Sequence, residues 1–232
     1  MASHGKKRHT KRIAMPVANP AARKLKKWMK TTSAGAHAKE HSAPLVSVLR
    51  DLLKVTENER EAKLVLNASE VKIDGRVVND KGFAVGLMDV IEIPKLKLAK
   101  TLIFINSKLK TANATSGEKL CKITGKKLIS GGKTQLNLHD GRNITVAKTT
   151  LKTGDTLKIS VPAQKVIEEI KLEKGVNCYV SSGRHSGKTG TLVEVIAFAG
   201  STRPNVKLQA QDGTEFITLK DYVFAVNKNF AV

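Results

Sequence analysis

The sequence is poor in aromatic residues and in acidic side chains. Phe, Trp and Tyr make up 4% of its 232 residues, so any packed core must be mainly aliphatic. Asp and Glu number 20 against 41 Lys and Arg, which gives a formal net charge of +21. Such an excess repels itself in the free protein, and a polyanion would relieve the repulsion. RNA, DNA and an anionic membrane surface are therefore the candidate partners.

Long apolar runs and closely spaced cysteines are also missing. Crossing a bilayer takes about 20 consecutive apolar residues, and no run approaches that length. The first residues lack the apolar stretch of a secretion signal, and no Gly follows Met1 to suggest myristoylation. Cys121 and Cys178 lie far apart, without metal-ligand spacing. We expect reduced structural thiols, no metal, no organic cofactor and a cytoplasmic protein that does not bind a membrane.

Residues 1–42 form a basic stretch with eleven Lys or Arg and one acid, Glu40. Apart from Leu25, Trp28 and Met29, little in it could enter a core. Two interpretations remain open: a solubilising tail, or an arm that becomes ordered only against a polyanion. Trp28 lies among lysines and could either stack on a base or fill a crevice, and the sequence does not decide between these roles.

Two helices are predicted at the start of the following segment. Apolar residues at helical spacing over 45–53 predict the first. Thr56 and Glu59 have the spacing of a capping box, which predicts that the second begins there and continues through 64–66. Like charges share a face on each helix, Arg50 with Lys54 and Arg60 with Lys63. This arrangement suits contact with phosphates but also fits a solvated face.

Strands dominate the rest of the chain. Asp74-Gly75 within 71–78 predicts a tight hairpin, and residues 90–93 predict a strand ended by Pro94. Beyond residue 95, short alternating runs are separated by turn pairs such as Asp140-Gly141 and Asp212-Gly213, which indicates small barrels. Residues 166–172 fit either a helix or a strand.

Two tempting motifs fail on inspection. Gly187-Lys188-Thr189 resembles the end of a phosphate-binding loop, but the first glycine of that motif is displaced and a strand-like run follows where a helix is required. Residues 81–84 begin like the signature of an RNA-recognition motif, but the later aromatic positions do not match. Neither nucleotide hydrolysis nor that kind of base-stacking sheet is predicted.

The glycine-rich segment 183–190 fits better as a basic loop between two strands. Its glycines permit positive φ and close backbone approach, and they display Arg184, His185 and Lys188 for phosphate contact. This arrangement resembles the KOW module of ribosomal and transcription-elongation proteins, which is a small β-barrel with a loop that touches RNA.

The order of these segments resembles the archaeal and eukaryotic ribosomal protein S4e family along essentially the whole chain. The similarity includes the basic run 5–12, the segments 44–51, 71–77, 85–91 and 135–144, the KOW-like loop and the final segment 219–225. A chain that stops at Val232 is shorter than most eukaryotic members, which favours an archaeal source.

The resemblance implies an α+β, multi-domain protein. It implies a basic extension (1–42), a small α/β S-four-type RNA-binding domain (43–106), a β-rich central domain (107–172) and a KOW-type barrel with C-terminal strands (173–232). In S-four-type domains the two helices and the following hairpin present the RNA-binding face. That role falls here on Arg50, Lys54, Arg60, Lys63, Lys72 and Arg76.

The predicted function is that of a non-catalytic structural protein of the small ribosomal subunit. Its expected partners are small-subunit ribosomal RNA and neighbouring ribosomal proteins, with no small-molecule substrate. An assembly or transcription-elongation factor with the same modules remains an alternative, whereas no acid, base or nucleophile is set as an RNA-modifying enzyme would need. The predicted RNA-binding residues are Lys6, Lys7, Arg8, His9, Lys11, Arg12, Arg50, Lys54, Arg60, Lys63, Lys72, Arg76, Arg142, Arg184, His185 and Lys188.

Overall fold

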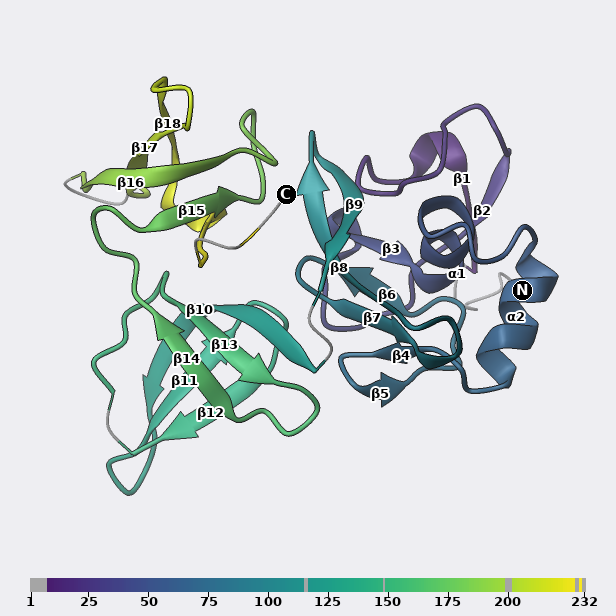
Figure 1. The fold of residues 1–232 in the computed structure, drawn as a ribbon, viewed down its shortest axis with the longest axis horizontal. Helices are drawn as coiled ribbons and strands as arrows, with labels where there is room; N and C mark the ends of the chain where they lie inside the picture. Colours follow the sequence, from purple (N-terminus) through teal and green to yellow (C-terminus); the bar gives the residue numbers. More distant parts are fainter. Residues whose placement is uncertain (1–7, 115–116, 148, 199–201, 228–229, 231–232) are drawn as a thin grey trace, which may run out of the picture.

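A computed structural model describes residues 8–114, 117–147, 149–198, 202–227 and 230. The chain is mostly β, with two short helical segments and several antiparallel sheets (Figure 1). Three lobes follow the sequence: an N-terminal lobe that carries both helices, a central lobe and a C-terminal lobe. None of the described helices is both long and apolar enough to cross a membrane.

The N-terminal lobe is built on a sheet of order β5-β4-β7-β8-β9. Its strands are β4 (Lys72–Ile73), β5 (Arg76–Val77), β7 (Val90–Ile93), β8 (Leu98–Ile105) and β9 (Lys108–Asn113). A two-stranded pair, β3 (Ser42–Pro44) and β6 (Ala84–Gly86), lies beside α1 (Leu45–Ser47) and α2 (Glu59–Asn67). Aliphatic side chains such as Leu45, Leu49 and Ile91 fill the core between them.

The predicted hairpin and helices are present, with one correction. Asp74 and Gly75 form the turn between β4 and β5, both with positive φ. The first helix continues from α1 into a π-helical turn over Val48–Leu52. The predicted capping box at Thr56 and Glu59 is wrong: α2 has Asn58 at its N-cap, Thr56 is buried, and Glu61 accepts the Glu57 amide hydrogen at 2.9 Å. Glu61, in the first turn of α2, therefore accepts a backbone hydrogen bond at the start of this helix in place of Glu59.

The N-terminal lobe extends beyond residue 106, where the predicted domain ends. Asn106 and Ser107, both with positive φ, are the turn of the β8–β9 hairpin, and β9 pairs with β8 along its length. The turn lacks the Asn-Gly or Asp-Gly signal of common two-residue hairpins, which is why the sequence pattern did not indicate it.

Residues 8–42 fold against the N-terminal lobe, contrary to the expectation that this stretch has almost no buried contacts. β1 (His9–Lys11) pairs with β2 (Trp28–Lys30), and Met15, Ala21 and Met29 form a small core of their own. Ala18 joins the main core, where its carbonyl oxygen accepts the Leu109 amide hydrogen at 3.1 Å. Of the three predicted core candidates, Met29 is buried, whereas Leu25 and Trp28 are exposed.

The central lobe is a curled half-barrel of order β12-β11-β10-β13-β14. Its strands are β10 (Glu118–Leu128), β11 (Thr134–Leu138), β12 (Asn143–Val146), β13 (Thr156–Ser160) and β14 (Val166–Ile170). β10 pairs with β13 through its first half and with β11 through its second, and the register shifts between Ile123 and Gly125. This division of one long strand between two neighbours makes the sheet curl around its core. The ambiguous segment 166–172 is thus mainly strand.

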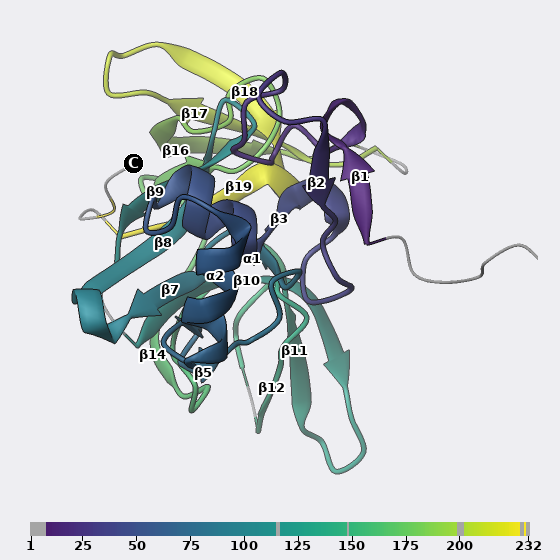
Figure 2. The ribbon, with the colours of Figure 1, turned by 90° about the vertical axis from the view of Figure 1, so that its right-hand side faces the viewer.

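The C-terminal lobe is an antiparallel sheet of order β18-β17-β16-β15-β19. Its strands are β15 (Asn177–Val180), β16 (Thr189–Ile196), β17 (Asn205–Gln209), β18 (Glu215–Leu219) and β19 (Val223–Ala225). Residues 181–188 connect β15 to β16, so a loop between two strands is present as predicted, although residues 189 and 190 of the predicted loop belong to β16. Figure 2, turned by 90°, shows this lobe and the central lobe behind α1 and α2.

Candidate RNA-binding interface

The α2 helix and the β4–β5 hairpin carry exposed cations on the N-terminal lobe. Arg60 and Lys63 on α2 and Arg76 on β5 are exposed. An ion pair joins Glu59 of α2 to Lys81, and Arg60 and Lys63 have no such partner in the described part of the chain. These side chains can approach phosphates without first breaking an internal bond.

Lys54 and Lys72 differ in their surroundings. Lys54 is exposed after the π-helical turn and has φ of 54°, a left-handed conformation that turns the chain away from the helix. Lys72 is half-buried on β4, where it lies opposite Glu92 of β7. A neighbouring carboxylate offsets part of the charge of Lys72, so its attraction for phosphate is weaker.

The β1–β2 pair adds a second group of exposed residues. Arg8, His9 and Lys11 are all exposed on β1 or just before it. Lys6 and Lys7 lie outside the described residues. In Figure 2 the pair forms an outer edge of the N-terminal lobe, away from the central lobe.

Arg12 and Arg50 are predicted RNA-binding residues that the structure places among internal partners. Arg12 is 4% exposed and donates hydrogen bonds to the carbonyl oxygens of Ala21 and Asn19. Arg50 forms a bidentate pair with Asp51, at 2.7 and 2.6 Å, and this hydrogen bonding raises the pKa of the Arg50 guanidinium. Arg12 holds the extension together internally, whereas Arg50 reaches from the first helical segment to Met29 Sδ of the extension, at 3.9 Å. These internal contacts make both guanidinium groups poor candidates for RNA contact.

Arg142 also lies inside, at the junction of the N-terminal and central lobes. Its guanidinium contacts Asp74 at 2.7 Å and Asp140 at 3.3 Å. Lys119 completes this ion cluster, with its Nζ 2.7 Å from both Asp74 and Asp89 and 3.1 Å from Asp140. The Lys119 side chain is fully buried. Although burial alone would lower it, the carboxylates of Asp89 and Asp74 raise the pKa of Lys119 well above its usual range.

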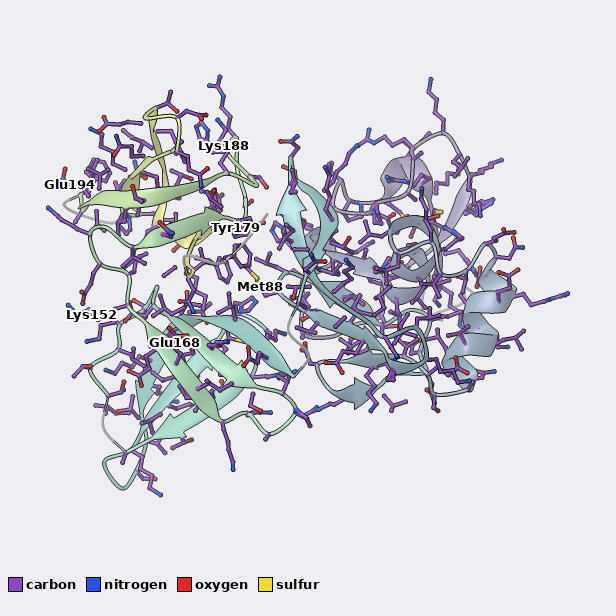
Figure 3. All side chains as sticks on the ribbon, in the orientation of Figure 1. Met88, Lys152, Glu168, Tyr179, Lys188 and Glu194 are labelled. Carbon is purple, nitrogen blue, oxygen red and sulfur yellow. The ribbon has the colours of Figure 1, made fainter. Side chains whose placement is uncertain are left out.

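The basic loop 183–188 is partly exposed and partly docked. Arg184 and Lys188 are exposed, and Figure 3 shows Lys188 at the loop. His185 packs on the Phe216 ring, 4.7 Å between centroids, and Lys188 Nζ lies 5.7 Å from the same ring. Burial, Lys188 and Arg184 lower the pKa of His185, so at neutral pH it offers hydrogen bonding rather than charge.

The base of the same loop is fixed to the β8–β9 hairpin. The Asn106 amide donates to the Ser186 carbonyl oxygen at 3.2 Å, and Gly187 lies so close to Ile105 that an added Cβ would come within 2.9 Å of its Cα. Close contact between two lobes therefore requires a glycine here.

Tyr179 makes a second connection between these lobes, on strand β15 (Figure 3). Its hydroxyl donates to the Phe104 carbonyl oxygen at 2.6 Å and accepts the Phe104 amide hydrogen at 2.7 Å. Tyr179, Phe224 and Val226 all join the hydrophobic core of the N-terminal lobe.

The central lobe meets the C-terminal lobe through Lys122. Lys122 Nζ donates to the carbonyl oxygens of Lys220 and Asp221 at 2.9 and 3.0 Å, and it lies 5.5 Å from the centroid of the Phe224 ring. Burial lowers the pKa of Lys122 to about 8. This lysine is a contact between lobes rather than a surface cation.

His139 connects all three lobes. Its Nδ1 accepts the Lys122 amide hydrogen at 3.3 Å, its Nε2 lies 3.2 Å from the Leu87 carbonyl oxygen, and its ring meets Phe224 edge-on. Burial lowers the pKa of His139 to about 4, so the ring is neutral at physiological pH.

Sequence reasoning missed these junction residues. One signal was available: Lys119 alternates with Cys121 and Ile123 on β10, at the inward positions of an apolar strand. A lysine at such a position predicts a buried ion pair. The partners could not be predicted from spacing, since Asp74 and Asp89 come from distant turns.

A cavity of about 730 Å³ lies at this junction, with Lys122, His139 and Phe224 in its wall. Nearby, Cys121, His139 and Asp140 hold their potential ligand atoms within 4.8 Å of one another. Those atoms already have protein partners, because Asp140 pairs with Lys119 and Arg142 and both His139 nitrogens are engaged. Burial also raises the pKa of the Cys121 thiol, which disfavours the thiolate that a metal requires. We assign no metal here.

Comparison with known proteins places the chain among ribosomal proteins. The small ribosomal subunit protein eS4 of Methanothermobacter thermautotrophicus is 40% identical over 100% of this chain and 97% of its own length. The eS4 protein of Methanosphaera stadtmanae is 42% identical over 99% and 96%. The chain belongs to the ribosomal S4e family.

Two further comparisons agree with S4e membership. The model of ribosomal family S4e matches residues 106–166, which span β9 and most of the central lobe. The crystal structure of the 30S ribosomal protein S4e from Thermoplasma acidophilum superimposes with a TM-score of 0.70 at 36% identity, covering 82% of this chain and 97% of that one. The S4e resemblance inferred from the order of the motifs is thus confirmed.

Proposed function

We propose that this S4e chain is a structural, non-enzymatic protein of the small ribosomal subunit that binds and stabilises folded ribosomal RNA through its exposed cations. The observation that carries this function is full-length similarity, at about 40% identity, to small-subunit eS4 proteins. Neighbouring ribosomal proteins are the other partners that membership implies.

Exposure to solvent decides which cations we assign to phosphate contact. An S-four-type face with Lys54, Arg60, Lys63 and Arg76, and with Lys72 in a lesser role, supplies phosphate contacts on the N-terminal lobe. The β1 edge supplies further contacts through Arg8, His9 and Lys11. The KOW-type loop supplies others through Arg184, His185 and Lys188. Lys6 and Lys7 continue the β1 edge in sequence.

Buried cations have a different role in this proposal. Arg12, Arg50 and Arg142 already hold internal hydrogen bonds, and exposing them to RNA would leave buried partners unsatisfied. They fix the geometry of the lobes on which the exposed cations are carried. The proposed RNA-binding surface then consists of three basic areas held in fixed positions by the folded lobes.

Binding to phosphate has a characteristic salt dependence that tests the proposal. The variant Arg60→Ala/Lys63→Ala is compared with Lys165→Ala/Lys171→Ala, which removes the same charge from exposed positions flanking the acidic strand β14. Affinity for refolded small-subunit ribosomal RNA is measured over a range of salt. We expect the slope of log affinity against log salt to fall by about 1.5 in the first variant only.

An equal loss in both double variants would contradict the assigned face.

Sedimentation of tagged protein from a lysate tests the ribosomal role itself: stoichiometric retention on mature small subunits after a moderate-salt wash is expected. Enrichment on precursor particles or polymerase instead would favour the assembly or elongation factor.

A further inference from the structure

Trp28 is displayed on a strand whose other side is anchored. On β2, the neighbouring Met29 is 4% exposed and packs with Met15 and Ala21, whereas Trp28 is 56% exposed. Successive residues of a strand face opposite sides, so burial of Met29 forces the indole outward. The pair with β1, with Thr10 opposite Met29, holds this arrangement in place. The indole is thus an exposed flat ring on an ordered base.

Two lysines share the face of the indole. Trp28 is opposite Lys11, and His9 is opposite Lys30, so these four residues share the outward face of the β1–β2 pair. Lys11 Nζ lies 6.0 Å from the centroid of the Trp28 ring. A group stacked on the ring would therefore have at least one ammonium group beside it.

The β1–β2 pair itself carries no carboxylate. The first acidic residue in the sequence is Glu40, so neither β1, β2 nor the loop between them contributes a carboxylate. The carboxylates nearby come from other elements: Glu59, whose pKa Lys81 and His9 lower, and Asp80, which lies with the Lys30 side chain beside Gly82. An exposed indole next to Lys11 fits a partner with a flat π-surface and attached negative charges. An unpaired nucleotide has both, whereas a duplex hides its base faces in the stack.

We propose that Trp28 stacks on an unpaired base of RNA, with Lys11 and Lys30 at the flanking phosphates. This inference rests on the proposed RNA-binding function and adds a single-stranded element to a surface otherwise built for phosphate and shape. Trp28 is the single tryptophan of the chain, so its fluorescence reports directly on this site.

The test titrates the full-length protein with a single-stranded RNA of about ten nucleotides, a duplex RNA of equal phosphate content, and polyglutamate. We expect strong quenching of Trp28 emission by the single strand and little by the other two. Trp28→Ala should weaken single-strand binding by about 5- to 100-fold and leave the salt slope unchanged, while Trp28→Phe should retain most of the affinity.

Leu25→Ala is the matched control, because Leu25 is a similarly exposed apolar residue, at 67%, in the loop before β2. It should bind like the parent protein. Unchanged affinity in Trp28→Ala with a normal salt slope would overturn the stacking role and leave the proposed function intact. If polyglutamate quenched Trp28 emission as strongly as the single strand does, the stacking role would be overturned in favour of an acidic protein partner. If the parent protein bound neither RNA, the proposed function itself would fail.

Discussion

Replacing Lys119 with methionine should strongly destabilise the protein. The substitution keeps much of the side-chain length but removes the ammonium group from three carboxylates, at 2.7, 2.7 and 3.1 Å. Asp74 and Asp140 retain Arg142, and Asp89 retains His37 at 2.9 Å. Because Asp89 and Asp140 are almost fully buried, we expect a loss of about 3–5 kcal/mol in the free energy of unfolding. Urea unfolding followed by circular dichroism measures it, with an unchanged m value.

A matched control is available on the neighbouring strand. Lys158 on β13 pairs with Glu118 at 2.7 Å, but both side chains are about one-third exposed. Lys158→Met makes the same chemical change where water screens the pair, so its cost should not exceed about 1 kcal/mol. Similar losses in the two variants would contradict the importance that we assign to burial.

The effect of Lys119→Met should also depend on pH. Burial alone would raise the pKa of Asp89, but Lys119 and His37 hold it far below its usual range. The parent protein therefore keeps the stability that the ionised Asp89 contributes at every pH above about 4. Without Lys119 the folded-state pKa of the cluster rises, and protonation then favours the folded variant. The difference between the two proteins should narrow as pH falls from 7 to about 4. A difference below 1 kcal/mol, or one independent of pH, would refute the reasoning.

Three other contacts between lobes give predictions of the same kind. Tyr179→Phe leaves the Phe104 amide and carbonyl without partners and should cost about 2–3 kcal/mol in urea unfolding. Burial lowers the pKa of His139 to about 4, against about 6.5 in the unfolded chain. Its neutral ring therefore contributes fully to the free energy of unfolding above pH 6.5, and this free energy should fall by up to about 3 kcal/mol as the pH approaches 4. His139→Gln should remove most of this pH dependence. Gly187→Ala, with φ of 92° and backbone within 2.9 Å, should lower the melting temperature more than Gly213→Ala, whose φ is 77° in open space.

Local signals in the sequence predicted local structure well. The Asp74-Gly75 hairpin and the loop between β15 and β16 depend on neighbours in the chain, which turn residues and alternation record. The β9 strand was missed because its turn carries an uncommon Asn-Ser pair. The extension was misjudged because its order depends on carbonyl oxygens around Arg12, which no periodic pattern reveals.

At the candidate site, too, properties that depend on composition could be predicted, whereas those that depend on distant contacts could not. Composition predicts a polyanion partner, and exposed cations such as Arg60 and Lys188 follow from it. Which cations are internal is a question of distant partners: Arg142 meets Asp74 across 68 positions of sequence. A basic residue next to an Asp-Gly turn looks the same in sequence whether it faces solvent or a carboxylate.

The core shared by the two ends of the chain has a consequence for the timing of synthesis. Val226 comes 117 positions after Leu109, yet both belong to the core of the N-terminal lobe. At 5–20 residues per second, roughly 6 to 25 s separate their emergence during translation. Tyr179 emerges 70 positions after Leu109, and until then the backbone of Phe104 lacks this partner, while α2 and the β1–β2 pair have already emerged. Under the proposed function, the cations of α2 and the β1–β2 pair are therefore available to RNA before the last strands complete this core.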